Sequence, residues 1–180
     1  PGVVFALSTA IRVMTKPGDA VLVQPPVYYP FYRVIHNNER TLVESPLVYE
    51  DGRYTIDFGD FERKIIEKDV KLFILCSPHN QVGRVWTREE LQQLVELAAR
   101  HGVVIISDEI HADFVYAPGK LTPMLSIREA WDCTIMLCSA SKTFNIAGLQ
   151  QANLVCFNPH MLKALQKEAG NIGMTSGNIF

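Results

Sequence analysis

A lysine flanked by hydroxyl groups follows a strongly apolar run in the last third of the chain. The run covers residues 133–138, and the lysine is Lys142, within Ser-Ala-Ser-Lys-Thr-Phe-Asn at 139–145. Partial burial beside a positively charged ring of a bound molecule favours the neutral amine of a lysine. A neutral amine can form a Schiff base with an aldehyde. Taken alone, Lys142 would also fit an exposed loop lysine, which is the commonest position for this side chain.

Two further polar segments follow predicted strands. Ser-Pro-His-Asn at 77–80 comes after the strand expected at 71–76, and Asp-Glu-Ile-His at 108–111 comes after the strand expected at 103–106. Open α/β sheets bind ligands at the carboxyl ends of their strands. An amide, a carboxylate and a lysine at three such ends are the groups that a pyridoxal phosphate site needs, with Asp108 for the pyridine nitrogen and Lys142 for the aldehyde. A lone Asp108 would also fit a helix cap.

Four segments make the chain similar to the large domain of fold-type I pyridoxal-phosphate enzymes. Within these enzymes it most resembles the cystathionine β-lyase, or C–S lyase, branch of the class I/II aminotransferase superfamily. The segments are Gln-Pro-Pro-Val-Tyr-Tyr-Pro-Phe at 24–31, Ser-Pro-His-Asn-Gln-Val-Gly-Arg at 77–84, Ser-Asp-Glu-Ile-His-Ala-Asp at 107–113 and Ser-Ala-Ser-Lys-Thr-Phe-Asn-Ile-Ala-Gly-Leu at 139–149. They run in the family's order over nearly the whole chain, so the set is specific although each segment alone is weak.

Strand and helix signals alternate along the chain, which predicts a three-layer α/β/α fold with a mostly parallel sheet. Helices are expected at 3–14, 29–37, 57–68, 87–101 and 159–169, and strands at 20–24, 41–44, 71–76, 103–106, 133–138 and 152–157. Thr87 and Glu90 predict a capping box, and Asp57 or Asp60 could cap the third helix. The resemblance implies that residues 1–180 are part of a pyridoxal-phosphate-binding large domain. We expect an N-terminal segment and a C-terminal small domain to lie outside this sequence, which ends in a turn-like stretch at 176–180.

The resemblance also implies roles for individual side chains. Lys142 would bind the cofactor aldehyde, Asp108 would pair with the pyridine N–H, and Asn80 would donate from its amide to the phenolic oxygen. Tyr28 would stack on the pyridine ring, with Tyr29 as the alternative. His111 stands where aminotransferases usually carry tyrosine, and Asp-Glu-Ile-His is typical of the C–S lyase branch. A satisfied, partly buried histidine is the alternative reading of His111.

The cofactor phosphate needs hydrogen-bond donors. Gly2, Val3 and Val4 open the first predicted helix, and backbone N–H groups at such a position attract an anion. The hydroxyl groups of Ser139 and Ser141 would add to this set. Arg84 is expected to be structural.

Two positions depart from family patterns. Gln81 follows Asn80 where the family has proline. If that peptide must be cis, a non-proline residue costs ~2.5–4 kcal/mol against ~0.5–1 for proline, so we expect either strain or a trans bond that misdirects Asn80. Gln150 stands eight residues after Lys142, where many aminotransferases place an arginine on the phosphate. With one cation fewer at the phosphate, looser binding is expected, although the lyase branch often has glutamine there as well.

Composition limits the other classes of function. Seventeen basic and nineteen acidic side chains give a net charge of −2, which argues against a nucleic-acid or membrane-surface role resting on bulk charge. No apolar run approaches the ~20 residues that span a bilayer, and we expect no signal peptide. The cysteines at 76, 133, 138 and 156 lie in apolar runs without metal-ligand spacing, as in a cytoplasmic protein with buried thiols and no metal.

The activity implied by the resemblance is β-elimination from an amino acid with sulfur at Cβ, such as cystathionine. The Lys142 amine would remove the Cα proton as general base, and thiol, pyruvate and ammonia would result. An aminotransferase is the nearest alternative, and a non-catalytic scaffold or regulatory module is the alternative from another class. A nucleotide-binding Rossmann domain is disfavoured because no Gly-rich turn with a following acid is present. A homodimer acting on a small amino-acid substrate is implied by the family alone.

Overall fold

Five α-helices, five short 3₁₀ helices and eight strands lie in the part of the chain, residues 2–173, that the computed structural model describes. The turn expected at 176–180 lies outside these residues. The helices are α1 Val3–Met14, α2 Pro30–Asn37, α3 Phe58–Glu67, α4 Arg88–His101 and α5 Pro159–Asn171. The strands are β1 Ala20–Val23, β2 Thr41–Glu44, β3 Val48–Glu50, β4 Arg53–Thr55, β5 Val70–Cys76, β6 Val104–Asp108, β7 Thr134–Cys138 and β8 Asn153–Cys156.

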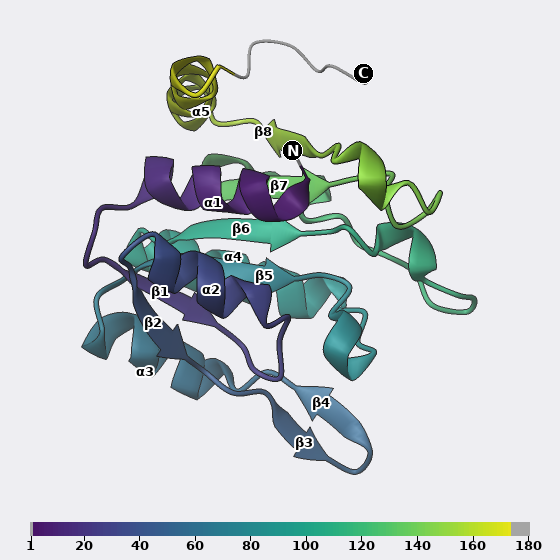
Figure 1. Cartoon of the computed structure of the whole chain (residues 1–180). Coiled ribbons are helices and arrows are strands. Elements are labelled where there is room, and N and C mark those ends of the chain that lie inside the picture. The colour runs from purple at the N-terminus through teal and green to yellow at the C-terminus, as the bar shows by residue number, and fades with distance from the viewer. Residues whose placement is uncertain (1, 174–180) are drawn as a thin grey trace.

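Six of the strands form one sheet in the order β2-β1-β5-β6-β7-β8 (Figure 1). All neighbours pair in parallel except β7 and β8, which are antiparallel. The mostly parallel sheet is therefore confirmed, while the direction of β8 was not anticipated. The chain between β7 and β8 contains a 3₁₀ turn instead of the crossover helix that usually joins parallel strands.

Helices cover both faces of this sheet, as the alternation within β5 illustrates. Leu72 and Ile74 pack in one core with α1 and α2, whereas Phe73 and Leu75 pack in the other with α3 and α4. Such a strand is apolar on both faces because neither face meets water. Figure 1 shows α1 and α2 in front of the sheet and α4 behind it, which confirms the three-layer prediction.

Helix boundaries follow from local capping chemistry. The Thr87 side chain accepts from the Glu90 N–H at 3.2 Å, and the Glu90 carboxylate accepts from the Thr87 N–H at 2.7 Å, so the predicted capping box is present. Helix α3 is capped by Asp57, which accepts from the Asp60 N–H at 2.9 Å. Asp60 is therefore not the cap of this helix.

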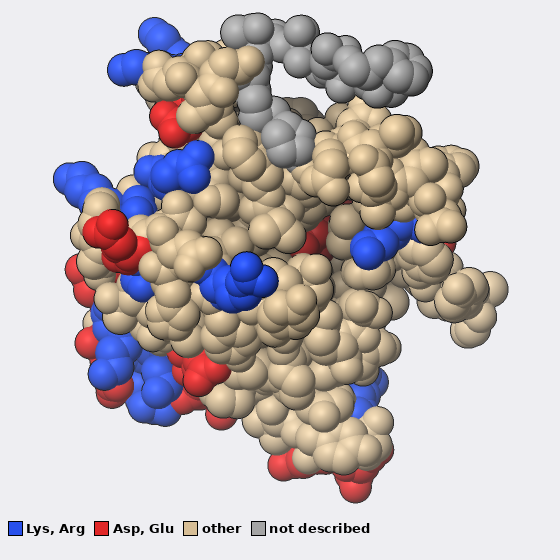
Figure 2. Space-filling view, viewed as in Figure 1, with Lys and Arg blue, Asp and Glu red and all other residues tan. Residues whose placement is uncertain are grey.

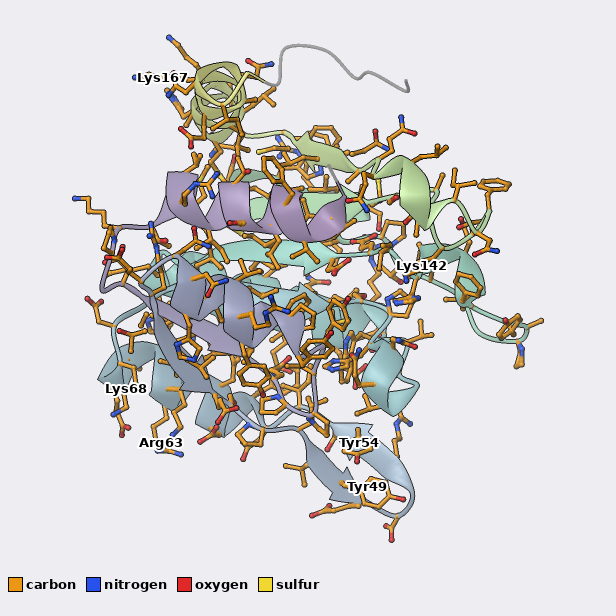
Figure 3. All side chains as sticks on the ribbon, in the orientation of Figure 1. Tyr49, Tyr54, Arg63, Lys68, Lys142 and Lys167 are labelled. Atoms are coloured by element: carbon orange, nitrogen blue, oxygen red, sulfur yellow. The ribbon has the colours of Figure 1, made fainter. Side chains whose placement is uncertain are left out.

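A small antiparallel hairpin, β3–β4, stands apart from the main sheet and was not predicted. Tyr49 and Tyr54 lie opposite each other on it, with ring centroids 4.7 Å apart (Figure 3). Each strand has three residues, too few to show the alternation by which strands are recognised in a sequence.

The topology brings four loops together at one edge of the sheet. From β1 the chain passes outward to β2, whereas β5, β6 and β7 lie on the other side of β1, so the strand order reverses between β1 and β5. Ligands of open α/β sheets bind beyond the carboxyl ends at such a reversal. The segments that begin after Val23, Cys76, Asp108 and Cys138 all start at this edge. No helix within residues 2–173 has the length and apolarity needed to cross a membrane.

Candidate active site

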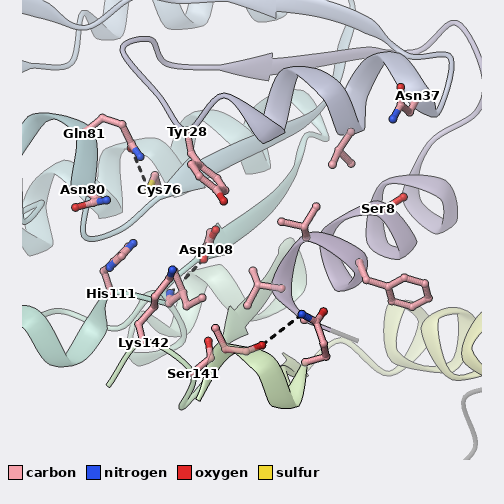
Figure 4. Close-up of a pocket in the computed structure, with 18 of the residues that line it drawn as sticks. Ser8, Tyr28, Asn37, Cys76, Asn80, Gln81, Asp108, His111, Ser141 and Lys142 are labelled. Atoms are coloured by element: carbon pink, nitrogen blue, oxygen red, sulfur yellow. Dashed lines mark hydrogen bonds between the residues drawn. The ribbon is translucent and has the colours of Figure 1, made fainter. Parts of the chain in front are cut away.

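A cavity of about 710 Å³ opens at the carboxyl edge of the sheet (Figure 4). It is lined by all the predicted site residues except Ser139: Gly2, Val3, Val4, Tyr28, Asn80, Asp108, His111, Ser141 and Lys142. Asp108 and Lys142 are the charged side chains among the described lining residues, apart from the titratable His111. On the face shown in Figure 2, the surface around the carboxyl ends of the strands is mostly uncharged. The charge chemistry of the cavity therefore rests on this one acid and one amine.

Asp108 is the last residue of β6 and lies at the floor of the cavity. Its side chain is 4% exposed and accepts a hydrogen bond from the Ile110 N–H at 3.1 Å. Within residues 2–173, no lysine, arginine or histidine pairs with it. Burial raises the pKa of Asp108 to about 6. A buried carboxylate with one donor is costly unless a cation or a further donor meets it, so the cavity floor fits a cationic N–H group.

Lys142 lies in the turn after β7 and lines the cavity near His111 (Figures 3 and 4). The residue is exposed, and its partial burial beside a cationic ring stays a prediction. In the described part of the chain it forms no ion pair, so its amine is free to meet a ligand. Burial, and secondly the charge of Lys142, lower the pKa of His111, which favours the neutral imidazole.

Tyr28 and Tyr29 differ in their relation to the cavity. Tyr28 lines it, and its ring stands edge-on to Phe31 with centroids 5.8 Å apart. Tyr29 does not line it and is 66% exposed. Burial, followed by the neighbouring Tyr29 and Asp108, raises the pKa of Tyr28, so its phenol stays protonated near neutral pH. Of the two tyrosines, the geometry favours Tyr28 as the ring that faces a ligand.

The loop after β5 places Asn80 at the cavity without a cis bond before Gln81. The cis peptides of residues 2–173 are three bonds that precede prolines, so Asn80–Gln81 is trans. Asn80 lines the cavity with this trans bond, and the expected misdirection of its amide stays a prediction. The buried His79 ties this loop to the segment after β1, because its Nε2 donates to the Pro26 carbonyl at 2.8 Å. Burial lowers the pKa of His79, in keeping with a neutral ring.

The amino end of α1 also lines the cavity, through Gly2, Val3 and Val4. The first N–H groups of a helix have no acceptor within it, so Val3 and Val4 offer donors to an anion there. Gln150 lies beside them, with its Oε1 3.7 Å from where a Cβ on Gly2 would be. The position at which many aminotransferases place an arginine, eight residues after Lys142, is therefore occupied by a neutral amide.

Ser139 was expected to add its hydroxyl to the cofactor site, but it does not line the cavity. Its hydroxyl donates to the Gln151 carbonyl at 2.6 Å and accepts from the Ser141 N–H at 3.0 Å. The antiparallel return of the chain into β8 brings Gln151 beside Ser139, and the hydroxyl is used to close this loop. Of the two predicted serines, Ser141 lines the cavity.

Cys76 and Gln81 also line the cavity and were not among the predicted site residues. Cys76 ends β5 directly before the Ser-Pro-His-Asn motif, and this position at a strand end could have identified it. Burial, and secondly Asp108, raise the pKa of the Cys76 thiol to about 12, so it is protonated and no nucleophile. All four cysteines are free thiols, and residues 2–173 contain no group of three or more metal-ligating side chains.

Glu109 is a second buried acid beside the cavity, and it predicts a pH dependence of stability. It accepts from the Met124 N–H at 2.9 Å and the Ser107 hydroxyl at 3.0 Å, and burial raises its pKa to about 7. The pKa values of Asp108 and Glu109 are both above those of unfolded chains. The folded chain therefore binds protons more tightly, and the free energy of unfolding falls as the pH rises from about 4 to 7, by up to ~1.4 kcal/mol per pH unit for each group.

Urea unfolding of the chain without added ligand, followed by circular dichroism between pH 4 and 8, measures this slope. Glu109→Gln should flatten its upper part, between about pH 5 and 7, because the amide does not titrate. An unfolding free energy that rises with pH over this window would contradict the expectation.

The family described as aminotransferase class I and II matches residues 1–177. The chain belongs to this family. It is 49% identical over 156 residues to cystathionine β-lyase PatB of Bacillus subtilis, covering 86% of this chain and 40% of that protein. It is 34% identical over 181 residues to protein MalY of Escherichia coli, covering 99% and 46%.

Two solved structures share the fold at similar identity. Cystalysin from Treponema denticola, whose structure contains a pyridoxal 5′-phosphate cofactor, has a TM-score of 0.91 and 41% identity, covering 98% of this chain and 44% of that one. The pyridoxal-phosphate-bound C–S lyase from Staphylococcus hominis has a TM-score of 0.90 and 35% identity, covering 94% and 43%. The chain spans less than half the length of each of these four relatives.

Proposed function

We propose that this chain carries the cofactor site of a pyridoxal-phosphate-dependent C–S lyase. The reaction is elimination of a thiol from an amino acid with sulfur at Cβ, of which cystathionine is one, with pyruvate and ammonia as the other products. The observation that carries this proposal is that one cavity holds both Asp108, a buried carboxylate, and Lys142, and that neither forms an ion pair within residues 2–173. The names of PatB, a cystathionine β-lyase, and of the S. hominis C–S lyase support the same reaction class, and the T. denticola structure supports the same cofactor.

The lining residues fit this cofactor group by group. When bound, pyridoxal phosphate supplies an aldehyde that reacts with amines and a ring that takes up electrons from a carbon atom. Asp108 would meet the ring N–H, and its ionised form would be favoured by that positive charge. The amino end of α1 and Ser141 would hold the phosphate, and Tyr28 would lie against the ring.

Lys142 has two tasks in this proposal. It would hold the cofactor aldehyde, and its free amine would act as general base for the proton on the substrate Cα. Lys142 is exposed, so surrounding side chains would not hinder movement of its amine between these two tasks. Asn80 and the neutral His111 line the same region and would donate to the cofactor's phenolic oxygen, which fixes the ring relative to Lys142.

The discriminating experiment separates elimination from transamination. The chain is saturated with pyridoxal phosphate and given cystathionine, with and without an added keto acid, and pyruvate and free thiol are measured. Equal amounts of pyruvate and thiol without keto acid support the lyase. Turnover that requires the keto acid and releases no thiol supports the aminotransferase, and a cofactor adduct at Lys142 without turnover in either mixture supports the non-catalytic scaffold.

Substitutions at Tyr28 are expected to report stacking. Tyr28→Ala should weaken the apparent affinity for pyridoxal phosphate by roughly three- to tenfold, as expected for loss of one aromatic contact. Tyr28→Phe keeps the ring and should stay within about twofold of the unmodified chain. Tyr29→Ala is the matched control, because this exposed ring does not line the cavity. Titration followed by absorbance measures all three, and a larger effect at Tyr29 than at Tyr28 would reverse the assignment.

The oligomeric state and the cellular compartment are also inferred from the family. We propose a cytoplasmic homodimer acting on a small amino-acid substrate. The four free cysteines support a reducing compartment. Light scattering after size-exclusion chromatography tests the dimer, and a single species with the mass of one chain would contradict it.

A further inference from the structure

We propose that Asp113 is a positioning residue for Lys142, acting through a hydrogen bond from Thr143. The Thr143 hydroxyl donates to Asp113 Oδ2 at 2.7 Å, joining two loops 30 residues apart in the sequence. Thr143 directly follows the lysine, and Asp113 lies two residues after His111. The inference rests on the proposed function, because it concerns the geometry in which Lys142 meets the cofactor aldehyde.

The polar contacts of the Lys142 turn are otherwise local. Its backbone bonds run from Phe144 to Ala140 and from Ile146 to Ser141, and both stay within residues 140–149. Within residues 2–173, the Thr143–Asp113 contact is the one hydrogen bond that ties residues 140–149 to a distant segment.

Apolar packing adds little to hold this turn. Phe144 is 69% exposed, Leu149 is 49% exposed, and Ile146 is half-buried but belongs to neither core, so no large apolar side chain of the turn is anchored in a core. A segment with few buried apolar contacts opens easily on its own. The position of Lys142 therefore depends on the single contact at Thr143 to an unusual degree.

The other end of the contact is firmly placed. Asp113 lies in a 3₁₀ turn, Ala112–Phe114, that follows β6 with one bond from Ala112 to Glu109 and another from Phe114 to His111. Asp108 and His111 belong to the same short segment. The contact thus fixes the lysine relative to the acid and the imidazole of the cavity. A misplacement of about 1 Å can slow a reaction by up to about 10²-fold, so a bond of this kind has a measurable effect on rate.

The test is the rate at which Lys142 condenses with pyridoxal phosphate. In that step the amine nitrogen adds to the aldehyde carbon and the aldehyde oxygen leaves as water. Asp113→Ala and Thr143→Val each remove the contact, and each should slow the reaction at saturating pyridoxal phosphate by about three- to tenfold. Thr143→Ser keeps the hydroxyl and should restore the rate of the unmodified chain.

Three readouts separate positioning from a structural role. The double variant should be no slower than either single one, since both remove the same contact. The concentration of pyridoxal phosphate at half-maximal rate and the urea midpoint should change little, because the contact is exposed. Unchanged rates in both single variants would overturn the inference and leave the proposed function standing. Independent, additive losses, or losses that follow the urea midpoint, would also overturn the inference. Absence of the Lys142 reaction in the unmodified chain would overturn the proposed function and this inference with it.

Discussion

Replacement of Lys142 by alanine is expected to lower pyruvate formation from cystathionine by roughly 10²–10⁴-fold, the usual contribution of a positioned general base. Among the described residues that line the cavity, Lys142 is the one lysine, so no other side-chain amine there can replace it as general base. The folded state should be unaffected, because the side chain is exposed and forms no ion pair within residues 2–173. Steady-state turnover and a urea unfolding curve on the same sample measure both quantities.

Lys120→Ala is the matched control for this prediction. Lys120 is also an exposed lysine at a loop position, but it does not line the cavity. Its loss should leave turnover unchanged within about twofold. If Lys142→Ala retained more than about a tenth of the turnover, the role of this lysine as general base would be contradicted.

Replacement of Asp108 by asparagine should have the second largest effect, a loss of roughly 10²–10³-fold in turnover at saturating cofactor, similar to the removal of one preorganised electrostatic group. The amide keeps an oxygen for the Ile110 N–H but no negative charge for a cationic ring nitrogen. Because burial raises the pKa of Asp108, the charge is costly to the folded chain when no cation meets it. Loss of turnover should therefore come without loss of the cooperative unfolding transition.

Glu109→Gln provides a demanding control for Asp108→Asn. Glu109 is the next residue, is equally buried and also has a raised pKa, but it does not line the cavity. Turnover in Glu109→Gln should stay within about fivefold of the unmodified chain. Similar losses in the two variants would mean that any change among these buried acids damages the site, and the specific role of Asp108 would be wrong.

Much of the fold could be predicted because its elements carry local signals. Helix α4 has a capping box, an apolar face and a glycine at its end. Residues 72–76 of β5 and 104–106 of β6 are continuous apolar runs, typical of strands buried on both faces. The antiparallel direction of β8 depends on the path of the chain after β7, which no residue of β8 records. The hairpin β3–β4 is too short for its pattern to stand out.

The composition of the candidate site was more predictable than its geometry. Parallel strands place their carboxyl ends at one edge, so the segments containing Tyr28, Asn80, Asp108 and Lys142 had to converge once the sheet was parallel. Whether a given side chain faces the cavity depends on contacts made only in the fold. Ser139 is an example, because its hydroxyl donates to the Gln151 carbonyl, which lies beside it only because the chain returns antiparallel into β8. The chemical roles of the lining residues stay predictions.

The central claim is that this cavity binds pyridoxal phosphate through Lys142. The most direct test is to mix the chain with pyridoxal phosphate, reduce with borohydride, and locate the adduct by peptide mass spectrometry. Borohydride adds hydride to the C=N bond and leaves a stable secondary amine on the modified lysine. We predict one dominant adduct at Lys142, lost in Lys142→Ala and strongly reduced in Asp108→Asn. Labelling spread evenly over surface lysines such as Lys68 and Lys167, with no preference for Lys142, would contradict the account.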